Sequence, residues 1–93
     1  MKEEFEQLIP DAKILESRIK EVYNGKSVTI ELIDDIREFM LKQNGEINTE
    51  RAQIIKEFTE LKVVPRQVNT IEGAITVFGL QYKDIGVEFA REK

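Results

Sequence analysis

The sequence predicts an all-α fold in which residues 1–93 form a single domain, a bundle of four to five helices. Apolar residues recur at three- and four-residue spacing along most of the chain, as on one face of an amphipathic helix. Two Asn-Gly pairs, at 24–25 and 44–45, divide the chain into segments of helical length. A chain of 93 residues can build one hydrophobic core. The alternative is an α+β fold, in which three helices precede a small antiparallel β-hairpin or meander in residues 63–91.

The first segment predicts a helix that ends at Asn24-Gly25, because glycine readily adopts the left-handed conformation that terminates many helices. Pro10 lacks an N–H group and crowds the carbonyl group four residues earlier. We therefore expect a short first turn or two, followed by a helix from about Pro10. Glu16 and Lys20 have the spacing of an ion pair on its exposed face. The apolar stripe of this segment contains Phe5, Leu8, Ala12, Leu15, Ile19 and Val22.

A second helix is expected over about residues 28–43. Ser27 or Thr29 can cap its first turn with a side-chain oxygen, and Asn44-Gly45 ends it as Asn24-Gly25 ends the first. Its apolar positions are Leu32, Ile33, Ile36, Phe39 and Met40.

A third helix is expected to begin at Asn48 or Thr49, either of which can serve as its N-cap. It continues until Val63-Val64-Pro65, because the residue before a proline is disfavoured in the helical conformation. Its inward positions are Ile54, Ile55, Phe58 and Leu61.

The last third of the chain carries conflicting signals. Seven apolar residues keep the helical spacing, whereas three glycines, each costing about 1 kcal/mol inside a helix, and the β-favouring run at 75–78 oppose it. A hairpin that turns at residues 83–86 is the competing interpretation. We favour a helix broken near Gly79. The seven residues are Val68, Ile71, Ile75, Phe78, Tyr82, Ile85 and Phe89, and the glycines are Gly73, Gly79 and Gly86.

The composition excludes several function classes. The chain has no cysteine and no histidine, so it lacks thiolate nucleophiles, thiolate metal ligands and the commonest catalytic base. Neither of the glycine-rich phosphate-binding motifs, G-x-G-x-x-G and G-x-x-x-x-G-K-S/T, occurs in the sequence. We therefore expect no enzymatic activity, no metal and no cofactor. With no apolar stretch long enough to span a bilayer, the chain is expected to be a cytoplasmic protein that does not bind membranes.

The leading functional hypothesis is a small protein-binding module without catalysis, acting as an adaptor, an inhibitor or an assembly factor. Residues 67–82 hold a single charged side chain, Glu72, so this segment needs to be covered. If the chain leaves part of it exposed, that part marks an interface with a protein partner or, in a homodimer, with a second copy. The predicted interface residues are Val68, Ile71, Ile75, Val77, Phe78, Leu80, Tyr82, Ile85, Val87 and Phe89.

A second hypothesis is a DNA-binding transcriptional regulator. Residues 79–86, GLQYKDIG, resemble the first half of the helix-turn-helix motifs of sigma factors and response regulators, with the turn at Gly79. The resemblance covers about a dozen residues, and the chain ends before the recognition helix of those motifs. The net charge of −4 disfavours nucleic-acid binding, which depends on neutralising phosphates.

A third hypothesis concerns four carboxylates on one face of the second helix, Glu31, Asp34, Asp35 and Glu38. Such a row can mimic nucleic-acid phosphates and occupy the basic cleft of another protein. The simpler interpretation is a solvated helix face. Small acidic helical proteins without cysteine occur among phage accessory proteins, a likeness of composition only.

Overall fold

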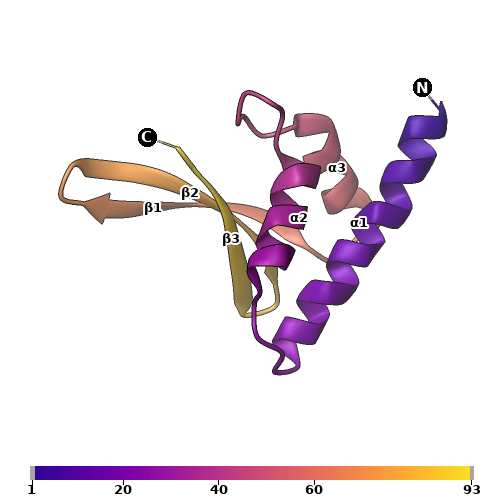
Figure 1. Cartoon of the computed structure of the whole chain (residues 1–93), viewed down its shortest axis with the longest axis horizontal. Helices are drawn as coiled ribbons and strands as arrows, with labels where there is room; N and C mark the ends of the chain where they lie inside the picture. Colours follow the sequence, from indigo (N-terminus) through magenta and orange to yellow (C-terminus); the bar gives the residue numbers. More distant parts are fainter. Residues whose placement is uncertain (1, 93) are drawn as a thin grey trace.

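The computed structural model describes the backbone of residues 2–92 and the side chains of residues 6–91. Within this range the chain forms three helices followed by three strands, so the fold is α+β and the predicted all-α helical bundle is wrong (Figure 1). The strands form one antiparallel sheet in the order β1-β2-β3. The elements are α1 Lys2–Tyr23, α2 Ile30–Met40, α3 Thr49–Phe58, β1 Lys62–Thr70, β2 Gly73–Tyr82 and β3 Ile85–Glu92.

Helix α1 runs without interruption through Pro10, which corrects the expected start near that residue. Pro10 is exposed, so water can reach the backbone carbonyl group that the proline leaves without a donor. The predicted end of the helix is confirmed: Asn24 and Gly25 donate backbone hydrogen bonds to the last turn, and Gly25 has a positive φ of 110°.

The expected caps of the next two helices are confirmed. The Thr29 hydroxyl accepts a hydrogen bond from the Leu32 backbone N–H at 3.1 Å, and the Asn48 side chain accepts one from that of Arg51 at 3.3 Å. Both helices are shorter than predicted. Helix α2 ends at Met40, where Leu41 becomes extended, and not at Asn44-Gly45. Helix α3 ends at Phe58 because Thr59 adopts an extended conformation, several residues before Pro65.

The C-terminal third forms the sheet. Strands β1 and β2 pair from Lys62↔Gln81 to Thr70↔Gly73, and Gly73, with φ of 124°, closes the hairpin. Strand β3 pairs with residues 76–82 of β2, with a register shift at Phe78/Gly79. Gly79 therefore lies inside a strand, which overturns the helix-turn-helix predicted to turn there.

The helices pack on one face of the sheet and bury the core between them. Because alternate strand residues point to opposite faces, Leu80 and its cross-strand partner Val87 point toward the helices. The β1–β2 hairpin extends past the helices (Figure 1). It also extends past the part of β2 with which β3 pairs. We call residues 66–76 of this hairpin the arm. The core contains Ala12, Leu15, Ile19, Leu32, Ile36, Phe39, Met40, Ile54, Ile55, Leu61, Leu80, Val87 and Phe89.

Candidate interaction surfaces

The face of the sheet that points away from the helices is the first candidate surface. Cross-strand partners point to the same side of a sheet, so the register assigns Val64, Val68, Ile75 and Val77 to this face. We call it the open face. Among the described residues, no helix packs on it, since the partly buried apolar residues around the core come from the opposite side of the strands. Val64, Val68 and Ile75 are half-buried there and Val77 is buried, so the open face is an apolar surface without a covering helix.

Charged side chains border the apolar part of the open face. The Arg66 guanidinium donates a hydrogen bond to the Glu88 carboxylate at 2.9 Å, across β2 from one edge strand to the other. Arg91 is the cross-strand partner of Val77. Val77 is only 6% exposed yet lies outside the core cluster. Its cover is therefore supplied by its neighbours on the open face.

Two glycines leave a hollow in the open face. Gly79 and Gly86 have no side chain, whereas the side chains of the neighbouring Val64 and Glu88 project from the sheet. The space between them measures about 250 Å³. A shallow hollow beside apolar side chains suits the insertion of a side chain from another molecule. Its lining consists of Val64, Arg66, Val77, Gly79, Gln81, Asp84, Gly86 and Glu88.

The structure divides the predicted interface residues into three groups, and their role in an interface stays a prediction. Leu80, Val87 and Phe89 belong to the core and cannot contact a partner in the folded chain. Phe78, Tyr82 and Ile85 are half-buried against the core. The others lie on the open face or, like Ile71, are exposed at the tip of the arm: Val68, Ile71, Ile75 and Val77.

The predicted acidic face exists as an exposed row on α2. Glu31, Asp34, Asp35 and Glu38 are all exposed, and Asp35 forms an ion pair with Arg18 of α1. Among the described residues, no group of three or more potential ligands is arranged to hold a metal ion. The row has the geometry of a solvated helix face with one carboxylate tied to a neighbouring helix.

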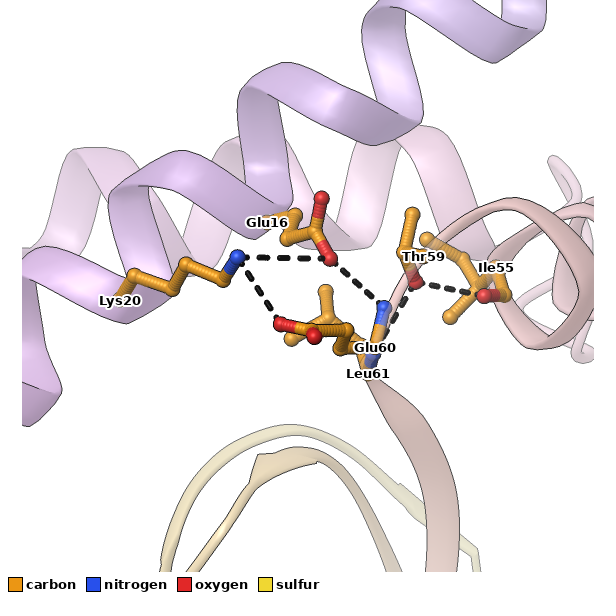
Figure 2. A network of polar contacts seen from close by, with 6 residues as sticks. All are labelled: Glu16, Lys20, Ile55, Thr59, Glu60 and Leu61. Carbon is orange, nitrogen blue, oxygen red and sulfur yellow. Dashed lines mark hydrogen bonds and ion pairs between the residues drawn. The ribbon is translucent and has the colours of Figure 1, made fainter.

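A polar network fixes the junction between α3 and β1 to α1 (Figure 2). The Glu16 carboxylate, 8% exposed, accepts a hydrogen bond from the Glu60 backbone N–H at 2.6 Å. The Lys20 ammonium lies 2.9 Å from the Glu60 carboxylate and 3.9 Å from that of Glu16. The hydrogen bond between Lys20 and Glu60 stabilises the charged form of both groups. It lowers the pKa of Glu60 and raises the pKa of Lys20. Glu16 is thus buried rather than on the exposed face that its spacing predicted.

A cleft between α3 and the start of β1 is a second candidate surface, which the sequence analysis did not identify. It measures about 730 Å³, with Ala52 and Val63 among its apolar residues and Lys56 and Lys62 among its charged ones. The other lining residues are Thr49, Gln53, Thr59, Glu60 and Leu61. The alternation of apolar and polar residues at 62–68, Lys-Val-Val-Pro-Arg-Gln-Val, is too irregular to have revealed the strand that forms one wall.

Within residues 2–92, no helix combines the length and the apolar content that a transmembrane span requires. Comparisons of the chain with protein-family models, with curated protein sequences and with solved structures found no significant match.

Proposed function

We propose that this protein is a non-catalytic protein-binding module that self-associates through the open face of its sheet. The observation that carries the proposal is the placement of Val64, Val68, Ile75 and Val77 on one face of the sheet, on which no helix of the described residues packs. A contiguous apolar surface of this kind is characteristic of interfaces. A second copy supplies a matching apolar surface, and two sheets pack face to face at about 10 Å.

A two-fold arrangement suits an interface between two copies, because each residue contact then occurs twice, with the partners exchanged. Charge alone does not set its orientation. The register places Lys62, opposite Gln81, at the same end of the open face as Asp84 and Glu88, and Glu88 already pairs with Arg66 of its own chain. The apolar residues near Val77 therefore carry the contact.

The test is a pair of valine-to-lysine variants measured by light scattering coupled to size exclusion at two concentrations. Val68→Lys places a charge on the open face, and we expect it to convert a dimer to a monomer because an unpaired charge in an apolar interface is costly. Val28→Lys is the matched control, since Val28 is 44% exposed in the α1–α2 connection and should leave the mass of the wild type unchanged.

Both variants should keep the helix content of the wild type in circular dichroism. Substitution of the core residues Leu80 or Val87 by lysine is unsuitable as a test, because it would unfold the chain. A monomeric wild type at both concentrations, or a Val68→Lys variant that remains dimeric, would refute self-association through the open face.

A second candidate function, DNA binding, draws support from the arm. The arm is a two-stranded ribbon that projects beyond the helices, and the major groove of DNA admits such a ribbon (Figure 1). The register places Gln67, Asn69 and Thr76 on its helix-side face, where amide and hydroxyl groups could contact base edges. The charged residues of the arm are Arg66 and Glu72, so its own charges cancel.

Fluorescence anisotropy with labelled duplex fragments, titrated with salt, discriminates this candidate. DNA binding through the arm predicts an affinity that falls steeply with salt and is lost in a Gln67→Ala/Asn69→Ala variant that remains folded. Absence of binding at low salt, or an unchanged affinity in the variant, would exclude the arm as a DNA-binding ribbon.

A further inference from the structure

The cleft between α3 and β1 lies along the free edge of the sheet. Lys62 and Val63 both line it, and consecutive strand residues point to opposite faces, so the cleft runs beside the strand rather than over one face. The other edge of β1 is occupied by β2, through the pairs Lys62↔Gln81 and Val63↔Leu80. The sheet order makes β1 an edge strand. An edge strand presents backbone N–H and carbonyl groups that another extended chain can pair with.

The backbone N–H groups of the three residues before β1 are already occupied by the chain itself. The N–H of Thr59 donates to the Ile55 carbonyl. The N–H of Glu60 donates to the Glu16 carboxylate, and that of Leu61 to the Thr59 hydroxyl (Figure 2). Pairing with an added strand must therefore begin at Lys62. It is limited at its far end by Pro65, which has no N–H to donate. The edge is suited to a short extended segment.

The charges of the cleft specify the chemistry of that segment. Its lining contains two lysines, Lys56 and Lys62, and one carboxylate, Glu60, which Lys20 holds in an ion pair at 2.9 Å. Among the described residues, neither Lys56 nor Lys62 forms an ion pair. The cleft is thus locally basic on a chain whose net charge is −4. Carboxylates on a bound segment would supply the missing partners.

We propose that the α3–β1 cleft binds an extended acidic peptide segment of a partner protein, which adds a strand to the free edge of β1. Side chains of the segment that point to the helix side meet Ala52, Val63 and Lys56. Carboxylates at the alternate positions pair with Lys62. This is strand addition, in which backbone hydrogen bonds provide affinity and alternate side chains provide specificity. The site lies at the edge of the sheet, where Lys62 shares the open-face side of β1 with Val64, and it does not depend on self-association.

The test uses a fluorescein-labelled octapeptide of alternating glutamate and valine, titrated with the full chain and followed by anisotropy. We expect saturable binding with a Kd below about 1 mM. An octapeptide of alternating lysine and valine is the charge control, and we expect it not to bind. Chemical shifts of the backbone amides, measured in the same titration, should change along residues 52–64.

Matched double variants test the role of the lysines. Lys56→Gln/Lys62→Gln should weaken binding of the glutamate–valine peptide by about fivefold, whereas Lys26→Gln/Lys42→Gln, with the same change of net charge on exposed sites outside the cleft, should bind as the wild type does. The proposal is overturned if no saturable binding occurs, if both peptides or both double variants bind alike, or if the shifts map to the acidic face of α2 or to the open face.

Discussion

Glu16 shows how a single residue can connect elements that are distant in sequence. It belongs to α1, yet its carboxylate accepts a hydrogen bond from the backbone of Glu60, 44 residues away, where the chain passes from α3 into β1. A buried carboxylate needs hydrogen-bond donors or a nearby opposite charge. Here the backbone N–H of Glu60 donates to it, and the Lys20 ammonium lies 3.9 Å away. The spacing of Glu16 and Lys20 predicts an ion pair but carries no information about the third partner.

The Lys20–Glu60 pair makes stability depend on pH. Because the pKa of Glu60 is lowered from 4.5, the pair stabilises the fold above that value, and the contribution is lost as the pH falls through the pKa of the folded state. The pKa of Lys20 is raised, so at high pH the stabilisation by the pair is lost as the pH rises through the pKa of Lys20 in the folded state. We expect Glu60→Gln to be less stable than the wild type at neutral pH and equal to it in acid.

Urea denaturation of both proteins at neutral and at acidic pH measures this difference. Glu60 is exposed, so the difference should also shrink when salt is added. If the difference in the free energy of unfolding between wild type and variant stays constant from neutral to acidic pH, Glu60 contributes through something other than its charge.

Two glycines of the sheet differ in what a methyl group would meet. A Cβ atom at Gly79 would lie 3.2 Å from the Val87 carbonyl oxygen, a backbone atom that can move only with its strand, whereas one at Gly86 would meet its nearest atom at 3.9 Å. We expect Gly79→Ala to cost about 1–3 kcal/mol and Gly86→Ala to change stability by less than about 1 kcal/mol. Thermal or urea unfolding compares them. Equal losses in the two variants would contradict the tight approach of β3 at Gly79.

At the scale of elements, the caps locate the helices within two residues. Ser27 and Thr29 both precede α2, but only Thr29 has its hydroxyl on the Leu32 backbone N–H. Thr29→Ala should therefore lower the free energy of unfolding by about 1 kcal/mol, and Ser27→Ala by less than about 0.5 kcal/mol. Urea denaturation of the two variants provides the measurement. A larger loss of stability in Ser27→Ala than in Thr29→Ala would contradict the assignment of Thr29 as the cap.

The sequence predicts the three helices well because their signals are local. The apolar stripes of α1 and α2, the caps Thr29 and Asn48, and the left-handed Gly25 each depend on residues within one or two turns. Gly45 is also left-handed, but it lies beyond the end of α2. Pro10 misled the prediction for α1, since a single exposed proline did not end a helix supported by tertiary packing.

The sheet could not be predicted with the same ease, because its apolar residues imitate a helix. Turns at 71–72 and 83–84 and the register shift at Phe78/Gly79 interrupt the alternation of each strand. Together they bring apolar residues of both faces into a three-four spacing that runs from Val68 to Phe89. The β-branched run at 75–77 and the three glycines were the correct signals. The helical three-four spacing outweighed these signals in the prediction, although its residues come from both faces of the sheet.

On the scale of the whole molecule, the open face explains why residues 67–82 are nearly free of charge. The segment has two apolar sides: one completes the core through Leu80, and the other carries Val77 and Ile75 on the open face. The need for cover on two sides was predictable from composition. Which residues serve which side was not, because it depends on strand register and on the extra residue near Gly79. The α3–β1 cleft depends on tertiary packing and left no signal in the sequence.

The most direct test of self-association through the open face is an isotope-filtered NOE experiment on an equal mixture of carbon-13-labelled and unlabelled chains. The arrangement predicts intermolecular NOEs to the methyl groups of Val64, Val68 and Ile75, and none to those of Val28 or Ile30, which lie in and next to the α1–α2 connection. Absence of intermolecular NOEs, or their location on the helices instead of the open face, would contradict the proposal.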